Sequence, residues 1–278
     1  MTVVAFQGER GAFSEEAARK LLGNDIEVAP CRTFEDAFAA VVNGSADCAL
    51  LPIENSIAGS VHRNFELLAE HGLTIAGEVH LRISHALIAV PGAVLADIRR
   101  VYSHPVALAQ CQHFLAQHAK LEVTAAYDTA GSVKMVMEGG ARHEAAIAGV
   151  HAAELYGASI LVAGIEDYKE NFTRFLLLMP AGSPPLARSD WPLKTTIFFR
   201  TPNRPGSLFR ALAAFALRDI NMTKIESRPI EGRTWEYSFY VDVSADLGNQ
   251  NLLNAIGHLR EMCETVRVLG CYPTGAAG

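Results

Sequence analysis

Short apolar runs alternate with longer segments of helical periodicity over residues 1–179. Strands are predicted at 3–6, 46–51 and 145–148, with a strand-rich stretch at 74–89, and helices at 14–22, 60–71, 105–118, 132–138 and 150–156. Pro52 is expected to end the second strand, and Ser14 to cap the first helix. This alternation predicts a largely parallel sheet with helices on its faces.

A stretch rich in Pro, Gly and Ser at 180–185 marks the best domain boundary in the chain. We therefore expect a first domain at 1–179, a linker at 180–193 and a second domain at 194–274. The second domain has predicted strands at 194–200, 220–229, 235–243 and 266–271 and predicted helices at 207–218 and 251–263. Their βαββαβ order is that of a ferredoxin-like unit, either a dimerisation module or a small-ligand sensor.

Composition excludes several classes of protein. The 278 residues are 50% hydrophobic and 19% charged, with a net charge of -6. This balance argues against a nucleic-acid surface, which needs clustered Lys and Arg. The five cysteines form no C-x-x-C pair, the N-terminus does not resemble a signal peptide, and no apolar window approaches the length of a membrane span. We expect a cytoplasmic protein that binds neither nucleic acid nor membrane.

The polar group that core packing explains least is Asn171-Phe172-Thr173-Arg174-Phe175. It stands directly before the apolar run 176–179, so it places an amide, a hydroxyl and a guanidinium at the end of a buried strand. Open α/β sheets bind ligands at such strand ends. The pentapeptide is therefore the first candidate site.

Another candidate stretch, 52–61, follows a buried strand and precedes a predicted helix. Glu54, Asn55 and Ser56 are expected at the N-terminus of that helix, with Gly59 allowing close approach of a ligand. Ordinary helix capping is the alternative, but it explains one polar residue better than three in a row. We favour a site at this position.

Three further positions carry weaker signals. Gly8 precedes a helix in a glycine-containing turn, where backbone N–H groups can face an anion, although a simple connection is equally consistent. Gln110 lies on the predicted helix 105–118, and its sequence alone favours a solvated residue. Thr129, in another turn between a strand and a helix, can offer a hydroxyl to a carboxylate.

Together these stretches resemble the prephenate dehydratase family. The resemblance rests on 8–14, on Pro-Ile-Glu-Asn-Ser-x-x-Gly at 52–59, on Ser-His-Pro and Gln-Cys within 103–111, and on Asn-x-Thr-Arg-Phe at 171–175. The second domain resembles the family's ACT regulatory domain through 203–208 and 226–229. The resemblance implies an α/β fold with a two-lobed catalytic domain like that of periplasmic binding proteins. Lobe one is expected at 1–77 and 160–179, and lobe two at 78–159.

The resemblance also implies the activity: conversion of prephenate to phenylpyruvate, carbon dioxide and water, without a metal or organic cofactor. Thr173 is expected to share its proton with the departing hydroxyl. Arg174 is expected either to bind a substrate carboxylate or to hold the strand end, and Glu54 to orient Asn55 and Arg174. The implied catalytic residues are Thr173, Asn55, Glu54 and Gln110, and the implied substrate-binding residues are Arg174, Phe175, Ser56, Gly59, Thr129 and Gly8.

The ACT resemblance implies inhibition by L-phenylalanine at interfaces between subunits of a homodimer or homotetramer. The implied effector-binding residues are Asn203, Pro205, Gly206, Ser207, Leu208, Glu226, Ser227, Arg228 and Pro229. Ser207 stands where the family usually has Ala, and Val106 where it often has Gln. The first change adds a hydroxyl near the effector, and we expect the second to be peripheral.

Two other functions remain open at this stage. Arogenate dehydratase performs the same elimination on the amino analogue of prephenate. A non-catalytic amino-acid sensor would use the same lobes and ACT domain, but the intact Thr173-Arg174-Phe175 argues against it. No chorismate mutase segment precedes Val3, so we expect a monofunctional enzyme.

Overall fold

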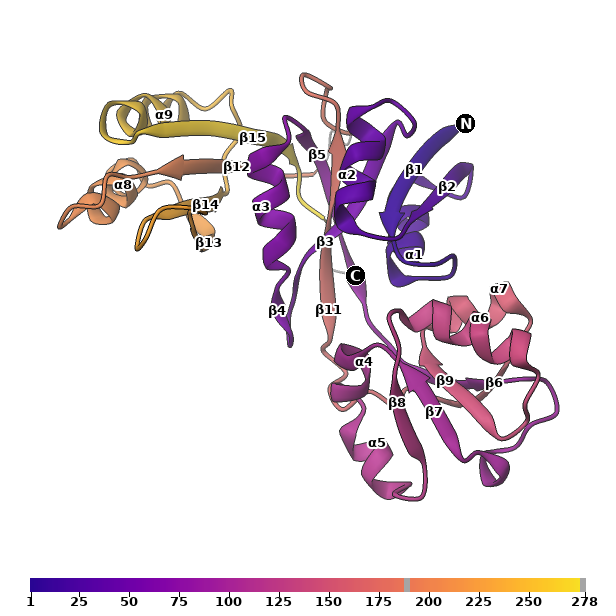
Figure 1. Cartoon of the computed structure of the whole chain (residues 1–278). Coiled ribbons are helices and arrows are strands. Elements are labelled where there is room, and N and C mark those ends of the chain that lie inside the picture. The colour runs from indigo at the N-terminus through magenta and orange to yellow at the C-terminus, as the bar shows by residue number, and fades with distance from the viewer. Residues whose placement is uncertain (188–190, 276–278) are drawn as a thin grey trace. The chain divides into compact units, whose positions relative to one another are not determined.

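The computed structural model describes residues 1–187 and 191–275. They form two compact units, one of Met1–Val61 and Val79–Phe175, the other of His62–Glu78 and the described part of Leu176–Ala276. Figure 1 shows the course of the chain through the helices and strands of both. Among the described residues no helix combines the length and hydropathy needed to cross a membrane. All five cysteines are free.

The first sheet has the strand order β2-β1-β3-β11-β5, with the short β4 paired to β3. Its strands are β1 (Thr2–Gln7), β2 (Ile26–Cys31), β3 (Cys48–Asn55), β4 (Gly59–Ser60), β5 (Thr74–Arg82) and β11 (Phe172–Met179), and the neighbouring helices are α1 (Phe13–Leu22), α2 (Phe34–Val42) and α3 (His62–Glu70). β1 pairs in parallel with both β2 and β3. The α/β alternation expected of this part of the chain is therefore confirmed.

The second sheet has the order β10-β6-β9-β7-β8 and is mixed, because β6 runs antiparallel to both β9 and β10. Its strands are β6 (Ala86–Ala89), β7 (Arg100–Ser103), β8 (Glu122–Ala125), β9 (Glu144–Ala148) and β10 (Ser159–Ala163). The helices are η1 (Leu95–Asp97), α4 (Pro105–Ala109), α5 (Gln112–Gln117), α6 (Thr129–Gly139) and α7 (Val150–Tyr156). The prediction of a largely parallel sheet is thus wrong for this half.

Several expected boundaries differ in the structure. β3 continues through Pro52, so Glu54 and Asn55 lie on a strand, and the expected helix N-terminus is instead the start of a tight hairpin to β4. α3 begins only at His62. Ser14 does not cap α1, whose N-cap is Ala12 without a side-chain bond. At each of these positions sheet pairing and packing set the boundary and override the usual local preferences of proline and serine.

The expected lobes also shift. β10 pairs with β6 in the second sheet, so the chain returns to the first sheet with β11 and not from residue 160. α3 and the first half of β5 cluster with the C-terminal half of the chain. Residues 188–190 of the expected linker lie outside the described residues.

The C-terminal half has the predicted βαββαβ order and the sheet order β13-β14-β12-β15. Its elements are β12 (Leu193–Arg200), α8 (Ser207–Ala216), β13 (Met222–Pro229), β14 (Tyr237–Val243), α9 (Gln250–Met262) and β15 (Thr265–Pro273). Apolar side chains of β12 and β14, such as Ile197 and Val241, form a core with α8 and α9. The ferredoxin-like prediction is therefore confirmed.

The other face of this sheet packs on α3 within the same unit (Figure 1). The Tyr240 hydroxyl donates to the Phe65 carbonyl over 2.5 Å, and their rings lie 5.0 Å apart. Arg267 donates to the Ala69 carbonyl over 2.7 Å. Alternate residues of the strands thus contact either α8 and α9 or α3, as the two-residue period of a strand requires.

Glu15 is a fully buried carboxylate on α1, with 0% of its surface exposed. It accepts hydrogen bonds from the Gly11 N–H (2.9 Å) and from Arg19 (2.7 and 3.1 Å), and His151 Nε2 lies 3.9 Å from it. Burial alone would raise the pKa of Glu15, but His151, Gly11 and Arg19 lower it to about 2. The Glu15 carboxylate is therefore ionised in the folded protein at neutral pH.

We predict that Glu15→Gln lowers the free energy of unfolding at pH 7 by about 3 kcal/mol, since each pKa unit corresponds to about 1.4 kcal/mol. Because the folded pKa is depressed, this stabilisation is present above the ordinary carboxyl range and fades as the pH falls toward 2. Urea unfolding at pH 7 and pH 3 measures both effects. Glu27→Gln, at an exposed position of β2, is the matched control. An equal loss for both variants at pH 7 would contradict the assignment.

Candidate active site

Asn55 lies at the end of β3, where the chain turns sharply into β4. Glu54 pairs with Ser60 and Asn55 with Gly59, whose φ of 84° favours glycine. The Asn55 side-chain oxygen accepts hydrogen bonds from the N–H groups of Ile57 (3.0 Å) and Ala58 (2.8 Å). These two backbone donors fix which end of the amide is the oxygen.

The NH₂ group of Asn55 consequently points toward β11. It donates to Thr173 Oγ1 over 2.9 Å and to Asn171 Oδ1 over 2.7 Å, with the Phe172 carbonyl at 3.2 Å. Thr173 is 8% exposed, and its hydroxyl has no acceptor among the described residues. A threonine oxygen that already accepts a hydrogen bond keeps its own proton available for another partner.

Gln110 joins the same network from the second sheet's side of the unit. Its Oε1 accepts from Asn171 Nδ2 and from His85 Nε2, each over 3.0 Å, and its Nε2 lies 3.5 Å from Asn55 Oδ1. Gln110 is buried, so the interpretation as a solvated helical residue is wrong. Asn55, Asn171 and Gln110 therefore form one continuous set of amides beside Thr173.

The expected single helix at 105–118 is broken at Gln110 and Cys111, and Asp167 explains the break. The Asp167 carboxylate accepts from the N–H groups of Gln112 (3.0 Å) and His113 (2.9 Å), and its own N–H donates to the Gln110 carbonyl (2.7 Å). A carboxylate that caps the first N–H groups of α5 stabilises a new helix start. This start turns Gln110 toward the site.

His85 is a site residue that the sequence reasoning missed. Burial lowers the pKa of His85, so the ring is neutral, and its bond to Gln110 Oε1 assigns the proton to Nε2. Glu166 holds this segment by accepting from the His85 N–H (2.9 Å), Arg82 (3.0 Å) and Ser84 (3.2 Å). The sequence signal that could have identified His85 is its position directly before the apolar run 86–90, which places a titratable side chain beside a buried strand.

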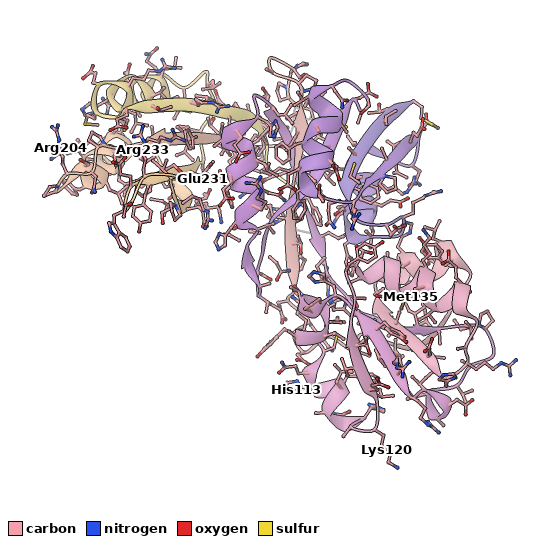
Figure 2. All side chains as sticks on the ribbon, in the orientation of Figure 1. His113, Lys120, Met135, Arg204, Glu231 and Arg233 are labelled. Carbon is pink, nitrogen blue, oxygen red and sulfur yellow. The ribbon has the colours of Figure 1, made fainter. Side chains whose placement is uncertain are left out.

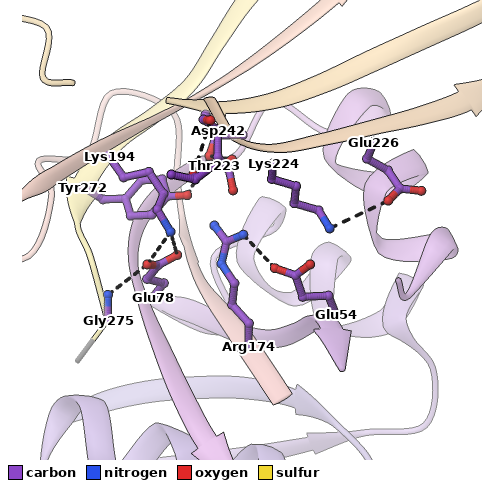
Figure 3. Close-up of polar contacts among 11 residues, drawn as sticks. Glu54, Glu78, Arg174, Lys194, Thr223, Lys224, Glu226, Asp242, Tyr272 and Gly275 are labelled. Carbon is purple, nitrogen blue, oxygen red and sulfur yellow. Dashed lines mark hydrogen bonds and ion pairs between the residues drawn. The ribbon is translucent and has the colours of Figure 1, made fainter. Parts of the chain in front are cut away.

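Arg174 lies on the opposite side of β11 from Thr173 and Phe175. Its guanidinium donates to Glu54 Oε1 over 3.0 Å, and Figure 3 shows this ion pair. Neither residue lines the cavity that opens beside Thr173 or the cavity that Gly8 lines. Of the two roles expected for Arg174, this placement favours the one in which Arg174 holds the strand end. Glu54 orients the Arg174 guanidinium, as expected, and the guanidinium does not line the cavity beside Thr173.

A cavity of about 550 Å³ opens beside Thr173 in the first unit, within the range of small-molecule sites. It brings together the expected site residues Thr173, Asn55, Gln110, Phe175, Gly59 and Thr129. Gly8 lines a second cavity of about 730 Å³, which shares Gln7, Arg32, Thr33 and Tyr127 with the first. Ser56 lines neither cavity, because its hydroxyl donates to the Glu170 carbonyl and accepts from the Phe172 N–H.

Gly8 has a packing role as well. Its φ is 120°, and a Cβ atom there would stand 2.8 Å from Asp128 Oδ2. Asp128 caps α6 by accepting from the Gly131 N–H over 2.6 Å. Burial raises the pKa of Asp128, which also lines the cavity beside Thr173. Glycine thus lets the loop after β1 approach the start of α6 closely.

The expected effector residues lie at one end of the C-terminal sheet. Arg228 and Arg200 both pair in register with Ser238, and the turn 203–208 begins three residues after Arg200. Figure 2 shows Arg204 of this turn at the surface. Glu226 and Arg228, from the second expected motif, face α3.

Arg228 donates to Glu66 Oε1 on α3 over 2.7 Å, and Glu226 Oε1 lies 3.6 Å from His62 Nδ1. Figure 3 shows the neighbouring contact between Lys224 and Glu226 and the bonds that Lys194 and Gly275 donate to Glu78. Among the described residues no group of His, Cys, Asp and Glu side chains could hold a metal ion.

Comparisons with known proteins identify the two parts of the chain. Residues 4–182 match the family model for prephenate dehydratase, and residues 195–260 match the model for the ACT domain. Arogenate dehydratase/prephenate dehydratase 1, chloroplastic, of Arabidopsis thaliana is 45% identical over 97% of this chain and 71% of its own length.

Two solved structures are also similar. Prephenate dehydratase of Arthrobacter aurescens in complex with L-Phe has a TM-score of 0.89 and 32% identity over 98% of this chain and 90% of that one. A structure described as GqqA, a novel type of quorum quenching acylase, has a TM-score of 0.88 and 38% identity, covering 99% of this chain and 98% of that one.

We predict that the His85 ring stays neutral, with the proton on Nε2, at pH values where an exposed histidine is already protonated, because burial lowers its pKa. The ¹⁵N shifts of the ring nitrogens between pH 5 and 8 report this state directly. A doubly protonated His85 ring at pH 6 would contradict the hydrogen-bond assignment.

Proposed function

Because the chain belongs to the prephenate dehydratase family, we propose that the cavity beside Thr173 converts prephenate to phenylpyruvate, carbon dioxide and water, with Thr173 as the proton donor. The observation that carries this proposal is the bond from Asn55 to Thr173 Oγ1, which leaves the threonine proton free beside the cavity. The activity is that of a carbon–oxygen lyase.

The reaction needs one proton and no oxidant. The bond between the ring and its carboxylate breaks, and the electron pair moves through the ring to expel the hydroxyl group on the opposite carbon. That hydroxyl leaves as water after it receives a proton, so the dianion and one proton give the phenylpyruvate monoanion, carbon dioxide and water. Thr173 regains its proton from solvent.

Thr173 shares its proton only while charge develops on the departing oxygen, because a free threonine hydroxyl is a weak acid. The Asn55 N–H donates to Thr173 Oγ1 and so stabilises the partial negative charge that forms there. Gln110 and Asn171 hold the Asn55 amide in this orientation. Positioned proton donors of this kind accelerate reactions by roughly 10²- to 10⁴-fold.

The departing carboxylate loses its charge as it becomes carbon dioxide. Phe13, Ile83 and Phe175 line the cavity and give this group an apolar environment. An apolar environment favours the neutral product over the anion, and therefore favours the loss of carbon dioxide.

We predict that Thr173→Ala lowers kcat by about 10²- to 10⁴-fold, since the variant lacks the shared proton. Thr173→Ser keeps the hydroxyl and should retain most of the rate, and Thr173→Val separates the loss of the hydroxyl from the loss of volume. Phenylpyruvate formation measures turnover, and circular dichroism checks the fold. Full activity of the alanine variant would overturn the role of Thr173, and a wild-type chain that binds prephenate without turnover would favour the sensor.

L-phenylalanine is the proposed effector, bound at the end of the C-terminal sheet that carries the turn 203–208 and the segment 226–229. The ACT match and the L-Phe complex of the Arthrobacter relative support this proposal. Arg228 is bonded to Glu66 on α3, and α3 begins one residue after Val61 in the chain segment that carries Asn55. Effector binding that alters this ion pair would therefore bias the conformation of α3. Such coupling is typically worth about 1–3 kcal/mol.

We predict that saturating phenylalanine lowers wild-type turnover and that Glu66→Gln reduces the maximal inhibition at least severalfold, because the Arg228 bond is lost. Glu70→Gln is the control, since Glu70 pairs with Arg63 on the same helix and not with Arg228. Initial rates at graded phenylalanine concentrations give both values. Unchanged inhibition in Glu66→Gln would contradict the route through α3.

The proposal also includes a homodimer or homotetramer in the cytoplasm. The five free cysteines support a reducing compartment. Phe209 and Leu217, at the two ends of α8, expose about three quarters of their surface, which supports an interface between copies of the chain.

A further inference from the structure

Arg32 stands at the junction of the two cavities and lines both of them. It is the only lysine or arginine among the described residues that line either one. It follows β2 directly, where the Gly8 N–H donates to the Cys31 carbonyl over 2.9 Å. On its other side Thr33 and Asp36 form a capping box with two bonds of 3.1 Å. The backbone on both sides of Arg32 is therefore fixed.

The guanidinium of Arg32 makes no hydrogen bond or ion pair in the described part of the chain, and the residue is exposed. Three other arginines of the same unit are already engaged in ion pairs. Arg19 binds Glu15, Arg82 binds Glu166, and Arg174 binds Glu54. Arg32 thus combines a fixed backbone, a free charged group and a place on the wall of the cavity that holds Thr173.

The charges of the cavity require such a group. Its lining includes the acidic residues Glu35 and Asp128. Prephenate carries two carboxylates, which these side chains repel. A site that binds a dianion needs a compensating cation, and arginine is suited to carboxylates because it offers two parallel N–H donors.

The two carboxylates of the substrate make different demands on a cation. The ring carboxylate loses its charge during the reaction, so an ion pair with it would stabilise the substrate more than the transition state. The side-chain carboxylate keeps its charge throughout. A cation bound to that group lowers the KM without opposing the chemical step.

Resting on the function proposed above, we propose that Arg32 binds the side-chain carboxylate of the substrate and favours the keto acid prephenate over its amino analogue arogenate. In arogenate an ammonium group stands next to this carboxylate and repels the guanidinium. Arg32 therefore contributes less to binding arogenate than to binding prephenate. Arg32 is a substrate-binding residue that sets specificity, and it takes no part in proton transfer.

Arg32→Gln should raise the KM for prephenate by about 10- to 100-fold, as expected for loss of a charge-assisted pair, and leave kcat within about threefold. The ratio of kcat/KM for prephenate to kcat/KM for arogenate should fall at the same time, and Arg32→Lys should restore part of both. Arg10→Gln is the matched control, because Arg10 is also exposed and its side chain is unpaired in the described chain, but it lines neither cavity. An unchanged KM in Arg32→Gln, or an unchanged ratio between the two substrates, would overturn the inference.

Binding of phenylpyruvate by calorimetry separates this inference from the proposed reaction, because the product keeps the side-chain carboxylate and needs no turnover. Arg32→Gln should weaken phenylpyruvate binding by at least about tenfold relative to the wild type and Arg10→Gln. If the wild-type chain turns over neither substrate while this loss is observed, the proposed reaction fails and the carboxylate site stands. Equal binding by all three proteins would overturn the carboxylate site.

Discussion

The amide of Asn55 is the interaction on which the rest of the site depends. Two backbone N–H groups of the β3–β4 turn fix its oxygen, so its NH₂ group can only face Asn171 and Thr173 on β11. Asn55 is half-buried, and the opposite orientation would take this acceptor away from the N–H groups of Ile57 and Ala58, so it is unfavourable. The direction of the Thr173 proton therefore follows from the geometry of a turn more than a hundred residues earlier in the chain.

Side chains of strand β11 alternate between its two faces, so the residues that line the cavity are separated from the ion pair of Arg174. Thr173 and Phe175 line the cavity, while Arg174, between them, is neutralised by Glu54 outside the cavity lining. An arginine held in this way stabilises the strand end and does not line the cavity that Thr173 lines. The charge that meets the substrate must then come from elsewhere, and Arg32 supplies it in our proposal.

In our proposal, helix α3 gives the C-terminal sheet a way to affect catalysis. Tyr240, Arg267 and Arg228 bind its backbone and its Glu66 side chain, so the sheet and the helix form one packed unit. The helix begins directly after the segment that contains Asn55 and Gly59. Covalent continuity alone therefore links the proposed effector site to the turn that orients the Asn55 amide.

The sequence by itself determined the alternation of strands and helices, the βαββαβ order after residue 193 and the candidates Thr173 and Asn55, because apolar periodicity and short motifs are local signals. Gln110 became a candidate only through the resemblance to the family. Tertiary structure decided what depended on distant partners. The Asp167 carboxylate caps α5, so the helix that begins at Pro105 ends before Gln110. Sheet pairing extends β3 beyond Pro52 to Asn55. Arg174 forms an ion pair with Glu54 and does not line the cavity. Buried His85 is hydrogen-bonded to Gln110 and so belongs to the set of side chains beside Thr173. Hydrogen bonds between residues 25 to 120 positions apart carry no periodic signal, so only the folded chain could show them.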